Sequence, residues 1–188
     1  MKRENLVKLV VSAMMIALST ALSFVTVYKL PLGGSVTLFS MLPVCMISIL
    51  YGPMYAVLPC TLYGLIQMAV GGIFGWGLTP TILIGSILLD YIVAFGSLCL
   101  TGVFGKSYGK ILGGIALAMV VRFVSHVISG YVLFANLEQW AFFGTTFENR
   151  PFLYSLAYNG SFMLPEAILT IVGAAVIFKL SAVKKLIK

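Results

Sequence analysis

The sequence predicts an all-α integral membrane protein: a compact bundle of six transmembrane helices with both termini in the cytoplasm. Of the 188 residues, 61% are hydrophobic and only 9% are charged, and the mean hydropathy is +1.09. A soluble domain carries about 25% charged residues, so this chain has too few to cover a water-facing surface. About 20 apolar residues cross a bilayer as a helix, so the length allows about six crossings with short connections. We expect one membrane domain over residues 1–188.

Long uncharged runs divided by glycine and proline locate the helices. They predict spans at residues 9–28, 36–50, 54–70, 79–103, 111–134 and 152–178. Residues 30–89 carry no charge and must fold back on themselves, at Tyr51-Gly52-Pro53 and at the glycines between positions 71 and 77. The first run also has features of a signal peptide, with small residues for cleavage at positions 17–21. Its length and the helices that follow favour a retained span.

The basic residues predict the orientation of the bundle. When the connections are assigned to alternate sides, nine cations share one side, and only Lys29 and Arg150 fall on the other. The nine are Lys2, Arg3, Lys8, Lys106, Lys110, Lys179, Lys184, Lys185 and Lys188. Cytoplasmic connections are enriched in Lys and Arg, which places both termini in the cytoplasm. The formal net charge of +7 therefore indicates topology rather than a nucleic-acid surface.

Four ionisable residues lie at membrane depth: Asp90, Arg122, His126 and Glu166. Each charged side chain there costs at least ~2.5 kcal/mol on insertion scales and needs a partner or a purpose. Asp90 and Arg122 are each eleven residues from one end of their spans, roughly 16 Å deep at 1.5 Å per residue. A simple ion pair between them is one interpretation. Arg122 and His126, four residues apart, share a helix face.

Aromatic and polar residues on several spans lie at a similar depth in the outer half of the membrane. They are Tyr154 and Asn159 in the outer half of the last span, Tyr63 near the middle of the third span or slightly outward, Trp76 in the outer loop that follows it, and Phe134 at the outer end of the fifth span. One such residue is usually ordinary core, but a set together with Asp90 and His126 is typical of a small-molecule pocket. Asp90, Glu166 and Arg122 together carry one net negative charge. This charge would suit a monocationic aromatic ligand that stacks on the rings.

The outer connection at residues 135–151 is rich in aromatic residues, including Trp140. It is interpreted either as an aromatic belt at the lipid headgroups or as a lid over an outward-facing pocket.

The first span carries Ala13, Ala17 and Ala21 at four-residue spacing. Small residues in register let another helix approach closely, so this face is a candidate docking surface. Ordinary packing within the bundle is the alternative.

Four sequence blocks follow one another along the expected spans. They are Pro31-Leu-Gly-Gly-Ser-Val-Thr-Leu leading to Met41-Leu-Pro43, Leu89-Asp-Tyr-Ile-Val-Ala-Phe95, Arg122-Phe-Val-Ser-His-Val-Ile-Ser-Gly130 and Tyr154-Ser-Leu-Ala-Tyr-Asn-Gly160. Through these blocks nearly the whole chain resembles the thiamine-specific substrate-binding subunits (S components) of energy-coupling factor vitamin transporters. The resemblance implies a six-helix bundle in the bacterial plasma membrane that captures thiamine from outside. It also implies two kinds of partner: a transmembrane coupling subunit and two cytoplasmic ATPases.

The resemblance also implies roles for individual residues. It places the family's polar ligand-binding positions at Asp90, Arg122, His126, Tyr154 and Asn159. Tyr63 and Phe134 fall where some relatives carry tryptophan. Gly34 and Leu38 stand where some relatives carry Trp and Glu, so Asp90 is expected to be the main anion. Glu166 is outside the motif, and the three alanines match the family's surface for the coupling subunit.

The expected mode of binding follows from these assignments. Thiamine would stack on one or more of Trp140, Phe134, Tyr63 and Trp76. His126, Tyr154 and Asn159 would hydrogen-bond the pyrimidine ring, and Asp90 would face the thiazolium. Closure of the segment at 135–151 would signal occupancy to the coupling subunit.

Other functions remain open from the sequence. The same scaffold could serve another vitamin, such as riboflavin or biotin, or a thiamine precursor. An intramembrane enzyme acting on a lipid through Asp90, His126 and Glu166 is a further alternative, although no local motif pairs carboxylates or forms a metal cluster. Six short helices make a poor channel without oligomerisation.

No cofactor, metal or nucleic-acid partner is expected, and membrane lipids surround the chain. Cys45, Cys60 and Cys99 lie in apolar runs without metal-ligand spacing. No Gly-rich loop is followed by Lys-Ser or Lys-Thr, so ATP hydrolysis is not expected of this chain.

Overall fold

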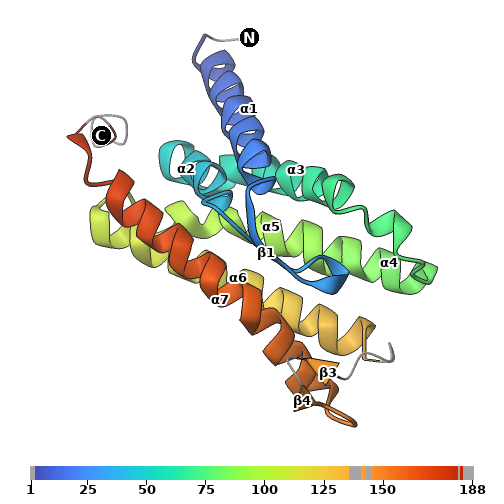
Figure 1. Cartoon of the computed structure of the whole chain (residues 1–188). Coiled ribbons are helices and arrows are strands. Elements are labelled where there is room, and N and C mark those ends of the chain that lie inside the picture. The colour runs from blue at the N-terminus through green and yellow to red at the C-terminus, as the bar shows by residue number, and fades with distance from the viewer. Residues whose placement is uncertain (1–2, 136–140, 143–144, 182, 184–188) are drawn as a thin grey trace.

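The computed structural model describes residues 3–135, 141–142, 145–181 and 183, and this part of the chain is mainly helical (Figure 1). Five of its helices are long and apolar enough to cross a membrane. They are α1 (Arg3–Ser23), α3 continued by η2 (Pro53–Gly75), the helix from α4 to η4 (Pro80–Gly102), α6 (Tyr108–Leu133) and α7 (Pro151–Ile177). These helices agree with the prediction of a multi-pass membrane protein.

The helix predicted at residues 36–50 is shorter in the structure. It begins at Met41 as α2 (Met41–Tyr51), and its 11 residues extend about 16 Å at 1.5 Å per residue. This length falls short of a hydrocarbon core of about 30 Å. The preceding residues form strand β2 (Ser35–Thr37), and Phe39, with a φ of 61°, separates the strand from the helix.

The first predicted span also extended too far. Helix α1 ends at Ser23, and strand β1 (Thr26–Lys29) follows. β1 pairs antiparallel with β2, with Tyr28 opposite Val36, across the short 3-10 helix η1 (Pro31–Gly33). β-branched residues on both sides of a Pro-Gly turn favour this hairpin over continued helix. In Figure 1 the β1–β2 hairpin crosses one face of the helix bundle.

The fourth span is not a uniform α-helix. α4 (Pro80–Ser86) passes into a π-helical segment, η3 (Ile87–Val93), then into α5 (Ala94–Gly96) and the 3-10 helix η4 (Ser97–Gly102). Insertion of a π turn rotates the following side chains and frees backbone carbonyls, and such turns often occur at functional sites. Ser125 on α6 donates a hydrogen bond of 2.6 Å to the carbonyl of Leu89 in this segment.

Helices α6 and α7 pack closely along their length. Ser155 donates a 2.8 Å hydrogen bond to the carbonyl of Val127. Gly130 makes this approach possible, because a Cβ at that position would lie 2.3 Å from the Ser155 hydroxyl. A second hairpin, β3 (Ala141–Phe142) with β4 (Thr145–Thr146), lies near the N-terminal end of α7.

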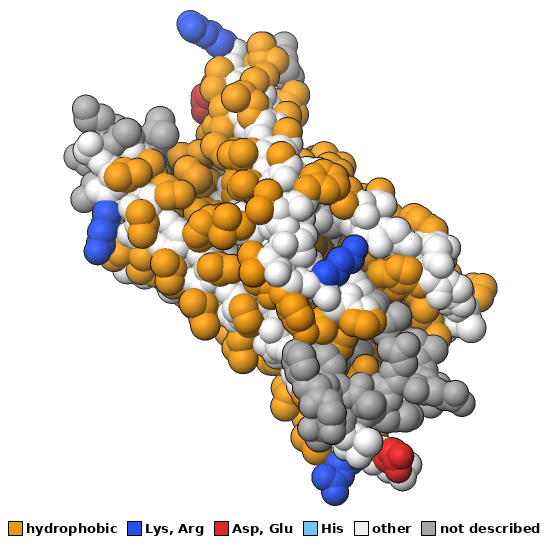
Figure 2. Space-filling view, in the orientation of Figure 1, with side chains coloured by type: hydrophobic (Ala, Val, Ile, Leu, Met, Phe, Trp, Pro, Cys, Tyr) orange, Lys and Arg blue, Asp and Glu red, His pale blue; other side chains and the backbone are white. Residues whose placement is uncertain are grey.

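Most of the visible surface is apolar, and the charged side chains lie mainly toward its periphery (Figure 2). Large apolar residues such as Met54, Leu58 and Ile168 are exposed, as expected for a surface that contacts lipid tails. Helix α1 projects from the rest of the bundle (Figure 1).

Candidate functional site

A cavity of about 440 Å³ lies between the β1–β2 hairpin and helices α3, α4, α6 and α7. This volume is within the range of about 300–1,000 Å³ that is usual for small-molecule sites. The residues lining it include seven that the sequence predicted: Trp76, Asp90, Arg122, His126, Phe134, Tyr154 and Asn159.

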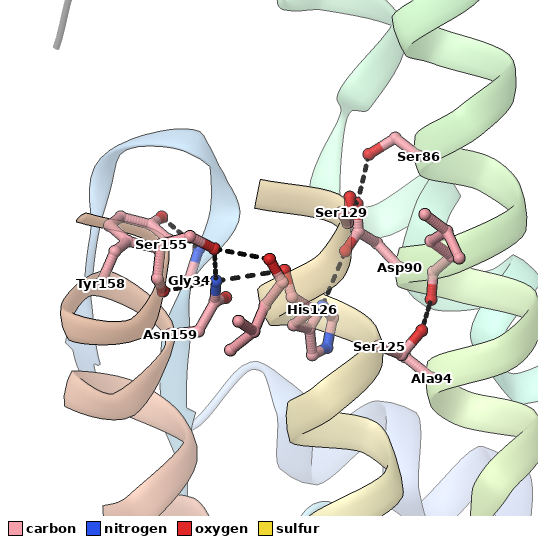
Figure 3. Close-up of polar contacts among 12 residues, drawn as sticks. Gly34, Ser86, Asp90, Ala94, Ser125, His126, Ser129, Ser155, Tyr158 and Asn159 are labelled. Carbon is pink, nitrogen blue, oxygen red and sulfur yellow. Dashed lines mark hydrogen bonds and ion pairs between the residues drawn. The ribbon is translucent and has the colours of Figure 1, made fainter. Parts of the chain in front are cut away.

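Asp90 lies in the π-helical segment and is held by three side chains (Figure 3). Its Oδ1 is 2.8 Å from Nδ1 of His126. Its Oδ2 accepts hydrogen bonds of 2.5 Å from Ser86 and of 2.5 Å from Ser129. The carboxylate is thus fixed at the boundary between the fourth span and α6, with a defined orientation toward the cavity.

The contact with Asp90 also determines what His126 presents to the cavity. In the neutral tautomer that donates from Nδ1 to Asp90, Nε2 is a hydrogen-bond acceptor. This Nε2 is buried and has no partner among the described residues. The ring meets Phe162 edge-on, at 5.9 Å between centroids. His126 can therefore accept a hydrogen bond from a donor on a ligand.

Asn159 on α7 is oriented by the same region of α6. Its Nδ2 lies 2.9 Å from the carbonyl of Ser155, 3.2 Å from the Ser155 hydroxyl and 3.2 Å from the carbonyl of His126 (Figure 3). No described residue donates to its Oδ1. The amide is held through its nitrogen, and its oxygen is available as an acceptor.

Arg122 lines the cavity but does not pair with Asp90. Among the described residues Asp90 contacts Ser86, His126 and Ser129, so the sequence-based alternative of a simple Asp90–Arg122 pair is not found. Arg122 is 6% exposed, and its guanidinium carbon lies 4.3 Å from the ring centroid of Phe95. Its Nε and Nη1 are buried without a hydrogen-bond partner among the described residues. This arrangement provides buried donors beside an aromatic face.

One wall of the cavity is an aromatic row along α7. Tyr154 and Tyr158 stack with centroids 6.2 Å apart, and Phe162 meets Tyr158 edge-on at 5.9 Å. The sequence analysis missed Tyr158 and Phe162, although four-residue spacing from Tyr154 puts them on its helix face. Ser86, which the sequence analysis also missed, lies four residues before Asp90 and donates a hydrogen bond to it. These patterns could have identified the additional wall residues.

The aromatic residues predicted for stacking occupy different places. Trp76 and Phe134 line the cavity. Tyr63 does not line it: its ring is fully buried and packs edge-on against Phe95, with centroids 5.5 Å apart. Trp140 lies outside the described residues, as does part of the segment at 135–151 that was interpreted as a lid.

The β1–β2 hairpin forms a wall of the cavity that the sequence analysis did not identify. The Tyr158 hydroxyl accepts a hydrogen bond of 3.2 Å from the amide of Gly34 and donates to the carbonyl of Pro31. A Cβ at Gly34 would lie 2.9 Å from this hydroxyl, and one at Gly33 would lie 2.6 Å from the Trp76 ring. Because neither residue has a side chain, the tip of the hairpin can pack closely between Trp76 and α7.

The fold is that of a multi-pass membrane protein, and its cavity has the size usual for a small-molecule site. The chain belongs to the thiamine transporter protein family (Thia_YuaJ), whose model matches residues 9–186. It is 30% identical to the thiamine transporter ThiT of Bacillus subtilis (strain 168), over 93% of this chain and 92% of that protein. The resemblance inferred from the sequence blocks is therefore confirmed at the level of the family.

The fold is also similar to that of a solved structure. ThiT from Listeria monocytogenes superposes with a TM-score of 0.77 at 23% sequence identity, covering 98% of this chain and 99% of that one. This similarity supports the arrangement of helices described above.

Proposed function

We propose that this chain is the thiamine-binding subunit of an energy-coupling factor uptake transporter in the bacterial plasma membrane. The observation that supports it most directly is the cavity, in which a fixed carboxylate, an acceptor nitrogen, an amide and several rings converge in a member of the thiamine transporter family. Thiamine combines a flat cationic thiazolium with an aminopyrimidine, so it has a matching partner for each of these groups.

Buried charge favours a monocationic ligand. Asp90 is the only carboxylate among the described residues that line the cavity, and the guanidinium of Arg122 lies against the Phe95 ring instead of pairing with it, so a cationic ligand can pair with Asp90. Lys29 also lines the cavity, but its side chain is exposed. Because uncompensated charge is costly at membrane depth, a ligand with one positive charge is preferred over a neutral or anionic one.

We place the pyrimidine on the α6–α7 side of the cavity, because hydrogen-bonding side chains gather there. In our proposal the exocyclic amine donates to Nε2 of His126, and Asn159 and Tyr154 bond the remaining polar atoms of the ring. Asp90 lies nearest the thiazolium. Trp76 and Phe134 stack on the ligand. Tyr63 does not contact thiamine but packs against Phe95, which lines the cavity.

The exposed face of α1 is the proposed docking surface for the coupling subunit. Ser12, Ile16 and Ser19 are buried against the bundle, whereas Ala13, Ala17 and Ala21 are exposed. A row of small side chains on a projecting helix suits close approach of a partner helix. Two ATPase subunits would drive this partner from the cytoplasm, where both termini of a single six-span domain would lie.

A ligand panel tests the proposed function. Purified protein in detergent is titrated with thiamine, a thiamine phosphate, the isolated pyrimidine precursor, riboflavin and biotin, with quenching of tryptophan fluorescence as the signal. Saturable, tightest binding of thiamine is expected. Tighter binding of riboflavin or biotin would instead favour the same scaffold serving another vitamin, and turnover of a ligand without partners would favour an enzyme.

A further inference from the structure

Glu166 is a buried carboxylate that the proposed binding mode does not place against the ligand. It lies on α7, directly after Pro165, and is 2% exposed. It is not among the residues that line the cavity. An acidic side chain in a membrane-spanning helix is costly enough to require a purpose.

The carboxylate of Glu166 is hydrogen-bonded to Thr37, the last residue of β2, which we call the inner end of the β1–β2 hairpin. Oε2 accepts a 2.7 Å hydrogen bond from the backbone amide of Thr37, and Oε1 accepts a 2.9 Å bond from the Thr37 hydroxyl. Ser40 is bonded to the same hydroxyl at 2.5 Å. Hydrogen bonds to an ionised acceptor are about twice as strong as neutral ones. Both oxygens of Glu166 therefore hold a single residue of β2.

These bonds fix one end of a cavity wall. Thr37, Ser35 and Gly34 on the hairpin all line the cavity. At the tip, Tyr158 binds Gly34, and at the inner end Glu166 binds Thr37. Both anchors lie on α7, two helical turns apart, so this helix positions the whole hairpin relative to its own side chains at the site. After Thr37 the chain turns at Phe39 and enters α2 at Met41, so this end of the hairpin is joined directly to the helix bundle.

We infer that Glu166 is a positioning residue: its carboxylate holds the inner end of the β1–β2 hairpin against α7 and thereby sets how fast a ligand enters and leaves the cavity. The inference concerns the hairpin geometry and rests on the proposed function only for the identity of the ligand. Its rival is electrostatic: the negative charge of Glu166 attracts a cationic ligand from behind the wall. If Glu166 anchors the hairpin, the ligand rate constants depend on the length of its side chain. If it attracts the ligand, they depend on its charge.

Two conservative variants distinguish the effect of side-chain length from that of charge. Glu166→Gln keeps the side-chain length and an acceptor for the Thr37 amide, and its amide nitrogen can donate to the Thr37 hydroxyl, which accepts as well as donates. Glu166→Asp keeps the charge but is one methylene shorter and cannot maintain both bonds. Thr101→Val is the matched control, because Thr101 is a buried, hydrogen-bonded residue that does not line the cavity.

Hydrogen–deuterium exchange of the ligand-free protein tests the anchor without any ligand. Glu166→Asp is expected to speed exchange of the amides at residues 35–37 by tenfold or more, whereas Glu166→Gln and Thr101→Val leave them within about threefold of the wild type. Unchanged exchange in Glu166→Asp, or equally fast exchange in Glu166→Gln, would overturn the inference.

Stopped-flow tryptophan fluorescence then measures the thiamine association and dissociation rate constants. Glu166→Asp should raise both, with dissociation about tenfold faster, and Glu166→Gln should stay close to the wild type. The reverse pattern, with slow association and fast dissociation in Glu166→Gln alone, would establish the electrostatic rival. If wild-type protein does not bind thiamine, the proposed function fails, and the exchange experiment still decides the role of Glu166.

Discussion

Asp90 combines two unusual features, a π-helical backbone and three side-chain donors on one carboxylate. Ser86 and Ser129 hold Oδ2, and His126 holds Oδ1, so the group is oriented before any ligand arrives. Such pre-organisation reduces the ordering cost of binding. In the proposed binding mode, Asp90 therefore acts on a cation through its charge and not by donating a hydrogen bond.

Asp90→Asn tests this charge. The amide is nearly the same size but neutral, and its NH₂ group conflicts with at least one of the three donors. We expect thiamine affinity to fall roughly 30- to 5,000-fold, since removing one partner of a buried charge pair costs about 2–5 kcal/mol. Isothermal titration calorimetry measures the loss, and unchanged affinity would contradict an ionic role.

Asn159→Ala tests the amide at the opposite wall. The substitution removes the acceptor oxygen that faces no described donor and also the contacts that link α7 to the His126 carbonyl. A lost buried hydrogen bond costs about 1–3 kcal/mol, so thiamine affinity should fall roughly 5- to 150-fold. Thr170→Val, on the same helix but remote from the cavity, is the control for altered packing. Equal affinities in the two variants would remove Asn159 from the site.

Sequence analysis gives the depth of these residues but not their rotation about the helix axis. Depth placed Asp90 and Arg122 at one level, yet the π segment and the Phe95 ring turn them to different partners. Tyr63 is buried in the core, where its ring packs edge-on against Phe95. Glu166 appeared to belong with the ligand charges, and its bonds are with Thr37. Side-chain direction depends on packing between helices, which spacing along one chain does not encode.

At the scale of elements, the β1–β2 hairpin is the part of the fold that the sequence analysis did not predict. Hydropathy located the long helices well, because glycine and proline mark their ends. In the first two predicted spans the apolar runs continue through β1 and β2, so hydropathy alone extended one helix into the hairpin and began the next too early. The β-branched residues and the Pro31-Leu-Gly-Gly turn distinguish strand from helix there, a signal of residue type rather than of hydrophobicity.

Gly34→Val tests the packing of the hairpin tip against α7. With a φ of −58°, Gly34 does not need glycine for its backbone, so the effect comes from collision with Tyr158 and Phe162. The tip should be displaced from α7, and thiamine should dissociate about tenfold faster in stopped-flow fluorescence, a change of about 1.4 kcal/mol. Gly160→Ala is the control, since a Cβ there meets nothing within 4 Å. A normal rate in Gly34→Val would show that the tip contact does not retain the ligand.

At the scale of the whole molecule, the candidate binding cavity and the proposed docking surface on α1 involve different parts of the chain. The cavity is formed by the hairpin and helices α3 to α7, whereas α1 presents alanines on a surface that the bundle leaves uncovered. Polar contacts join α1 to α3, such as the 3.1 Å hydrogen bond from Gln67 to Ser23. The proposal therefore predicts that ligand capture and partner contact can be altered independently.

Ala13→Trp tests that independence. A large ring on the exposed face of α1 should prevent close approach of a partner helix without reaching the cavity, because the residue is exposed and does not line it. Thiamine affinity in detergent should stay within about twofold of the wild type, while uptake into vesicles containing the coupling subunit and ATPases should fall tenfold or more. Ile168→Trp, at a 61% exposed position on α7, controls for adding a ring to the lipid-facing surface and should preserve uptake. Loss of affinity and uptake together in Ala13→Trp would mean that α1 serves the packing of the fold, and normal uptake would place the docking surface elsewhere.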